Sequence, residues 1–95
     1  MIERHISFDV KPGRGQDFVR FFTEDYRPPV LAFDGLIECS LLLEADSGTR
    51  YQMIFRWEHP EDAVAWRVSE AHQGLQPALQ ALVDGMVIAA YTKVA

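Results

Sequence analysis

The order of apolar spacings along this chain is the feature that most constrains its fold. Ile2 to Val10 and Arg50 to Trp57 alternate apolar and polar residues, which is typical of half-buried strands. Between them, Gln16 to Tyr26 carries apolar residues at helical spacing, and Leu36 to Glu44 has the branched apolar residues of a strand. Arg4 alone interrupts the alternation of the first strand.

Turn-forming residues divide these segments from one another. Lys11-Pro12-Gly13 ends the first strand, and Asp34-Gly35 turns the chain before the second. Pro28-Pro29 is predicted to end or bend the first helix, because proline has no amide hydrogen to donate. Residues 45–49 form a polar, glycine-containing loop of hairpin length, so the second and third strands are predicted to pair as a β-hairpin.

The second half of the chain predicts another helical region and a last strand. Residues 60–62, a proline followed by two acids, are a favourable helix start, and the helix is expected to continue to His72. Gly74 is predicted to break it, with a second short helical turn over Gln76 to Val83. The β-branched and aromatic residues of Met86 to Val94 predict the final strand.

The resulting order is β-α-β-β-α-β, which predicts a ferredoxin-like α+β fold with one antiparallel sheet and both helical regions on a single face. Its 95 residues are too few for two hydrophobic cores, so residues 1–95 are expected to form a single domain.

The second face of the predicted sheet is not polar enough to meet water alone. It mixes the polar His5, Ser7, Ser40 and Gln52 with Leu36, Leu42, Ile54, Val87, Ala89 and Tyr91. A small domain gains stability when a partner covers such a face. We therefore predict a homodimer through the sheet faces.

Charge and cysteine usage exclude several classes of partner. The net charge of −5 without a basic cluster argues against nucleic acid and against an anionic membrane surface. The longest apolar stretches have only a few residues, far fewer than a membrane span needs. The single cysteine, Cys39, has no partner for an internal disulfide and no evident activating neighbour, so we expect an inert thiol in a cytoplasmic protein.

The segment from Phe55 to His72 (FRWEHPEDAVAWRVSEAH) resembles the most recognisable stretch of the antibiotic biosynthesis monooxygenase family. Pro12-Gly13, the phenylalanine-rich first helix and Gly35-Leu36 before a leucine-rich strand match the same pattern. The resemblance implies a dimeric α+β barrel with a pocket in each subunit between sheet and helices. It also implies oxygenation of a small phenolic or quinol-like aromatic ligand by molecular oxygen, with no bound flavin, metal or other cofactor.

Within this resemblance, Trp66 and His72 are the candidate catalytic residues. An indole N–H can hold a substrate oxygen, and a histidine can take the proton of a phenol near neutral pH. The alternatives are that Trp66 only fills the core and that His72 only favours a helix C-terminus. On a regular helix the two would point about 240° apart, so they meet only if the helix is distorted.

Five further residues are candidates for substrate binding. Tyr26 and Tyr51 each offer a hydroxyl at the end of an apolar ring, and Arg67 offers a positive charge for a developing anion. The alternatives are core tyrosines and, for Arg67 as for Arg56, a surface ion pair. Phe55 and Asp62 belong to the resembling segment. In one branch of the family Asn stands at the place of Asp62 and Tyr at that of His72, so the match there is inexact.

Other chemistries find little support in the sequence. His59 and His72 lack the spacing of a metal-ligand pair on one helix face, and no metal is expected. The haem-degrading branch of the family uses an Asn where Ile6 stands here. Two alternatives to oxygenation stay open, namely a non-catalytic small-molecule-binding or stress-related dimer and a haem-binding relative.

Overall fold

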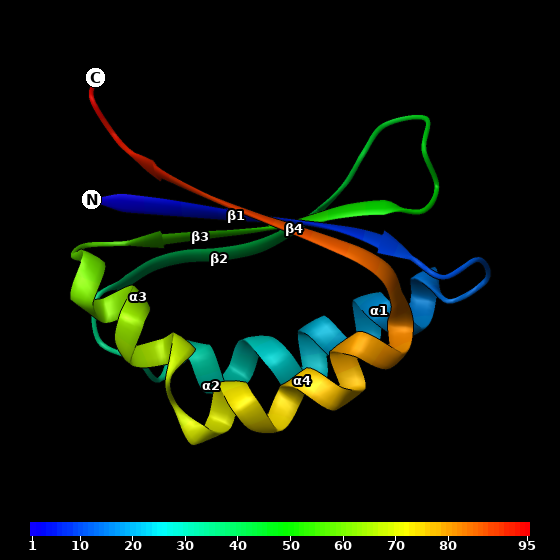
Figure 1. Cartoon of the computed structure of the whole chain (residues 1–95), viewed down its shortest axis with the longest axis horizontal. Helices are drawn as coiled ribbons and strands as arrows, with labels where there is room; N and C mark the ends of the chain where they lie inside the picture. Colours follow the sequence, from blue (N-terminus) through cyan, green and yellow to red (C-terminus); the bar gives the residue numbers. More distant parts are fainter.

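Four strands form one antiparallel sheet, and all helices lie on one of its faces (Figure 1). A computed structural model describes all 95 residues. The strands β1 (Ile2–Val10), β2 (Leu36–Leu43), β3 (Arg50–Trp57) and β4 (Val83–Thr92) lie side by side in the order β2-β3-β1-β4. The predicted α+β, ferredoxin-like fold class is confirmed. No helix has the length and apolar character needed to cross a membrane.

The register of the strands places the core on the helix-covered face. β1 lies between β3 and β4, and Ile6 is opposite Met53 on one side and Ile88 on the other. The helix-facing side of β1 and β3 is almost fully buried, as the 1% exposure of Phe8 shows. The outer strand β4 is covered less completely, because Met86 and Ile88 on the same face stay 43% and 51% exposed.

A β-bulge at the start of β2 corrects one predicted side-chain direction. Leu36 pairs with Trp57 and Glu38 pairs with Arg56, so Ile37 is an extra residue in the register. The extra residue moves the side chains before it to the other face of the sheet. Leu36 therefore packs against the core instead of lying on the second face of the sheet, where the simple alternation predicts it.

The first helical region bends but does not end at its prolines. It consists of α1 (Gly15–Phe21), a π-helical turn η1 (Phe22–Tyr26) and α2 (Arg27–Leu31). Pro28 and Pro29 stand in the first turn of α2, where missing amide hydrogens cost little. In the wider turn before them, the Arg27 amide donates to the Phe22 carbonyl five residues back. The turn keeps the rings of Phe22 and Tyr26 in the core.

The second helical region is divided at a different place from the predicted one. α3 (Pro60–Arg67) ends before Ser69, and α4 (Glu70–Leu82) begins directly after it. The Ser69 hydroxyl accepts a hydrogen bond from the His72 amide at 3.1 Å, which caps α4. The prediction of a break at Gly74 is wrong, because α4 passes through this exposed position and the cap decides where the helix starts.

Candidate functional site

A partly open cavity of about 120 Å³ lies between the helices and the strands β1, β3 and β4, and we call it the Trp66 cavity. Seven of its eleven lining residues are hydrophobic, and the others are two arginines, a histidine and a glutamine. The residues are Arg4, Ile6, Tyr26, Phe55, Trp66, Arg67, His72, Gln76, Leu79, Met86 and Ile88. Its wall therefore combines an apolar surface with a few polar groups, as small-molecule sites do.

The junction of α3 and α4 brings the two predicted catalytic residues together. The Ser69 hydroxyl donates to the Trp66 carbonyl at 2.7 Å and accepts from the His72 amide, so it fixes both sides of the turn. The rings of Trp66 and His72 lie edge to face with their centroids 5.2 Å apart. Without this turn a continuous helix would direct them to different sides.

Trp66 belongs to the core and to the cavity wall at once. Its side chain is 2% exposed, and its ring contacts Tyr26 and Phe33 edge to face, at centroid distances of 5.8 and 5.1 Å. Burial raises the pKa of Tyr26 to about 12, although the neighbouring Trp66 indole opposes this shift. The Tyr26 hydroxyl therefore keeps its proton at neutral pH and is suited to donate a hydrogen bond, not to act as a base.

His72 is the one cavity residue able to exchange a proton near neutral pH. Burial lowers its pKa, a nearby main-chain carbonyl of Arg67 opposes the shift, and the charges of Arg4 and Arg67 reinforce it. The neutral ring is thus the favoured form. Its Nε2 lies 3.2 Å from the side-chain nitrogen of Gln76, and its Nδ1 is buried without a hydrogen-bond partner. The same Gln76 nitrogen donates to the His72 main-chain carbonyl at 3.4 Å, so the donor side of the amide faces Nε2.

Arg4 and Arg67 supply the positive charge of the cavity. Neither forms an ion pair or a side-chain hydrogen bond, in contrast to Arg56, which binds Glu38 at 3.0 Å on the opposite face of the sheet. Burial lowers the pKa of Arg4, and the charge of Arg67 lowers it further. Sequence reasoning missed Arg4 as a site residue. Its interruption of the alternation in β1 was the available signal, because it places a charge on the helix-facing side.

The remaining predicted residues are divided between the cavity and other places. Phe55 lines the Trp66 cavity. Asp62 lies outside it, in the first turn of α3, where it packs so closely on Gly35 that a Cβ atom there would overlap its carboxylate. Cys39 is buried, and this burial raises the pKa of its thiol to about 12. No three His, Cys, Asp or Glu side chains converge as a metal-binding group.

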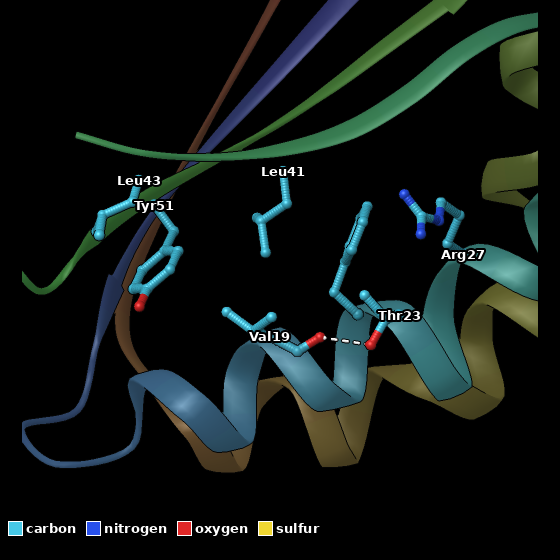
Figure 2. A pocket seen from close by; sticks show the side chains of 7 residues that line it. Val19, Thr23, Arg27, Leu41, Leu43 and Tyr51 are labelled. Atoms are coloured by element: carbon cyan, nitrogen blue, oxygen red, sulfur yellow. Dashed lines mark hydrogen bonds between the residues drawn. The ribbon is translucent and has the colours of Figure 1, made fainter. Parts of the chain in front are cut away.

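Tyr51 lines a second hollow, which we call the Tyr51 groove (Figure 2). This groove of about 270 Å³ lies between the first helical region and the strands β2 and β3. In Figure 2, Leu41 and Tyr51 on the sheet side face Val19 on the helix side, with Arg27 at one end. The groove is larger than the Trp66 cavity, but it contains no group that titrates near neutral pH. The Trp66 cavity is therefore the candidate active site.

Comparisons with known proteins agree with this architecture. The family model described as antibiotic biosynthesis monooxygenase matches residues 1–78. No curated protein matches the chain in sequence.

Three similar solved structures illustrate the fold. A conserved protein from Methanosarcina mazei Go1 has a TM-score of 0.89 at 20% identity, covering 98% of this chain and 92% of that one. A mutant of SnoaB, a cofactor-independent oxygenase from Streptomyces nogalater, has a TM-score of 0.87 at 18% identity, covering 97% and 91%. Rv0793 from Mycobacterium tuberculosis has a TM-score of 0.85 at 15% identity, covering 99% and 95%. At these identities the likeness shows the fold alone.

Proposed function

Because the chain belongs to the antibiotic biosynthesis monooxygenase family, we propose that it is a cofactor-independent monooxygenase that oxidises a small phenolic or quinol-like substrate with molecular oxygen. The observation that carries the proposal is the meeting of Trp66 and His72 at one largely apolar cavity. The description of SnoaB as a cofactor-independent oxygenase supports the same reaction class. The buried, unpaired Cys39 fits the cytoplasmic setting expected from the sequence.

Each polar group of the cavity has a role in this reaction. A phenol gives an electron to oxygen far more readily as its anion, so the first step needs a base. His72 is neutral and takes the phenol proton, while the Gln76 amide, 3.2 Å from Nε2, holds the ring in place. The protonated Tyr26 donates a hydrogen bond to the phenolate, and the positive charges of Arg4 and Arg67 in the cavity wall favour an anionic ligand.

The substrate itself supplies the electrons. A phenol with a free para position and one molecule of oxygen give a para-quinone and one molecule of water, so the ring is oxidised and no separate reductant is consumed. One oxygen atom enters the ring and the other leaves as water. Trp66, with Phe55 and Leu79, keeps bulk water from the reacting ring.

The size of the cavity limits the substrate to one aromatic ring. Its volume of about 120 Å³ is below the roughly 300–1,000 Å³ of sites for drug-sized ligands. Haem is larger still, and Ile6 lines the cavity where the haem-degrading branch has Asn, so we do not propose haem degradation.

Oxygen uptake by the purified protein tests the proposal. With a panel of single-ring quinols and phenols, we expect consumption of oxygen that falls at least tenfold in His72→Gln and in Trp66→Ala. Val68→Ala, at an exposed residue between the two helices, is the matched control and should keep the rate. Absence of uptake with every member of the panel contradicts oxygenation. A ligand that raises Tm without being turned over would then favour the non-catalytic binding protein.

We further propose that the protein is a homodimer through the uncovered face of the sheet. This face exposes Leu42, Val87 and Tyr91 by 50%, 69% and 51%, and His5 lies beside Tyr91 with ring centroids 4.9 Å apart. Burial of such side chains by a second copy is favourable.

Sedimentation velocity at micromolar concentration should give the dimer mass. Val87→Lys should shift the protein towards monomer, whereas Leu31→Lys, at a residue 61% exposed on the helix side, should not. A monomer mass for the unmodified protein refutes the proposal.

A further inference from the structure

We propose that Arg4 and Arg67 form an anion-binding site in the Trp66 cavity, and that the ligand is a single-ring aromatic carboxylate such as a hydroxybenzoate. This inference deepens the proposed function, because it concerns the same cavity and names the class of its substrate. It rests on the positions of the two arginines and on the absence of any acid among the residues that line the cavity.

Arg4 stands at a position where the fold otherwise buries apolar side chains. It is opposite Phe55 on β3 and Ala90 on β4, and its neighbours on the same side of β1 are Ile2 and Ile6. Arg4 is half-buried there, and leaving its charge partly desolvated and unpaired has a cost that a bound anion would offset. A charged residue among the apolar positions of a strand, with no oppositely charged partner in the fold, is typical of a functional position.

No partner for this charge exists within the chain. The acids of β1 and β2 that form ion pairs have other partners outside the cavity: Glu3 lies beside His5, Asp9 binds Arg50, and Glu38 binds Arg56. Arg67 adds a second positive charge to the same wall, so the two arginines repel each other until an anion lies between them. A carboxylate satisfies both, because it has two oxygens and guanidinium groups match its planar geometry.

The apolar part of the cavity accounts for the rest of the ligand. Trp66, Phe55 and Leu79 form a wall suited to one aromatic ring, while the volume of about 120 Å³ leaves little space for a second. A carboxylate held by the arginines would leave the ring beside His72, and a hydroxyl on that ring is the group from which the proposed oxidation starts.

A pair of probes of equal size tests the charge preference directly. Isothermal titration at constant ionic strength would compare 3-hydroxybenzoate with the neutral 3-hydroxybenzamide, both of which keep the position para to the hydroxyl free. A charge-assisted hydrogen bond corresponds to roughly 10-fold to 150-fold in affinity, so we expect the carboxylate to bind the wild type at least about tenfold more tightly. Equal affinities, or no binding of the carboxylate at millimolar concentration, overturn the proposal.

Variants locate the site. Arg4→Gln and Arg67→Gln should each weaken carboxylate binding about tenfold or more and change amide binding less than twofold. Arg20→Gln, which removes the same charge from an exposed residue of α1 outside the cavity, is the matched control. Loss of binding in Arg27→Gln instead would assign the anion to the Tyr51 groove and overturn the proposal.

Arg4→Lys keeps the positive charge but loses the planar guanidinium group. If Arg4→Gln is folded, Arg4→Lys should bind the carboxylate more tightly than Arg4→Gln and more weakly than the wild type. Recovery of the full affinity contradicts the two-oxygen geometry. Full loss in Arg4→Lys with an unchanged circular dichroism spectrum contradicts the contribution assigned to the positive charge.

The binding measurements do not depend on turnover. Carboxylate selectivity without any oxygen uptake would leave the anion site standing and remove the oxygenase proposal. Oxygen uptake with a neutral quinol, combined with equal binding of the two probes, would support the oxygenase proposal and refute the anion site.

Discussion

Replacement of Ser69 by alanine tests how the turn between α3 and α4 builds the candidate site. The Ser69 hydroxyl makes two hydrogen bonds, at 3.1 Å from the His72 amide and at 2.7 Å to the Trp66 carbonyl. Loss of a serine N-cap typically costs about 1 kcal/mol of stability. The second bond adds only about 0.5 kcal/mol, because the Ser69 amide also donates to the Trp66 carbonyl and leaves it paired.

The expected loss in the free energy of unfolding is therefore about 1.5 kcal/mol. For a domain of this size it corresponds to a fall in Tm of roughly 6–12 °C. Urea unfolding followed by tryptophan fluorescence measures it, because Trp57 and Trp66 are both buried in the folded state. Ser7→Ala, at a serine whose hydroxyl makes no hydrogen bond within the chain, is the matched control and should stay within about 0.5 kcal/mol.

A second measurement separates positioning from stability. The His72 ring is buried against Trp66 only because of the turn. In Ser69→Ala, the pKa of His72 measured by NMR should therefore move upwards, towards its ordinary value. If Ser69→Ala and Ser7→Ala have the same stability, the capping argument is wrong. If stability falls while the pKa of His72 stays unchanged, the cap stabilises α4 without positioning the histidine.

Two other predictions follow from local geometry and from burial. Gly35→Ala should lower the free energy of unfolding by about 2–4 kcal/mol in urea titration, since φ is +79° and the new Cβ overlaps Asp62. Gly48→Ala, with φ of +77° and no atom within 4 Å, should cost only about 1 kcal/mol, and equal losses would refute the clash. Because the folded-state pKa of His72 lies below its unfolded value of about 6.5, wild type should lose stability as pH falls below about 6.5 and through the folded-state pKa. His72→Gln should lack this contribution, and identical pH profiles of stability from pH 8 to 5 would contradict it.

The sequence is sufficient for the strands of this fold and for their order. Alternation along β1 and β3 identifies the buried side correctly, because a strand exposes successive side chains on opposite faces. It fails at Leu36, where one extra residue in β2 reverses the direction. The extra residue becomes visible only when β2 is paired with β3.

The helices show where local rules are insufficient. Gly74 lowers helix propensity, but the cap at Ser69 places the break earlier, and an exposed glycine inside a long helix costs only about 1 kcal/mol. Pro28-Pro29 does not end the first region, which continues from the π-helical turn into α2. The first difference arises because the Ser69 cap decides where α4 starts, and the second because prolines in the first turn of α2 remove no helical hydrogen bond.

By itself, the sequence determined the β-α-β-β-α-β order, the buried faces of its central strands and the two residues, Trp66 and His72, that lie at the candidate site. Tertiary structure decided that these two residues meet, because the Ser69 turn redirects α4 towards Trp66. It also decided that Arg4 and Arg67, 63 positions apart in the chain, face one cavity while Tyr51 faces another groove. Periodicity fixes the face on which a side chain lies, but the neighbours across a cavity depend on how separate elements pack together.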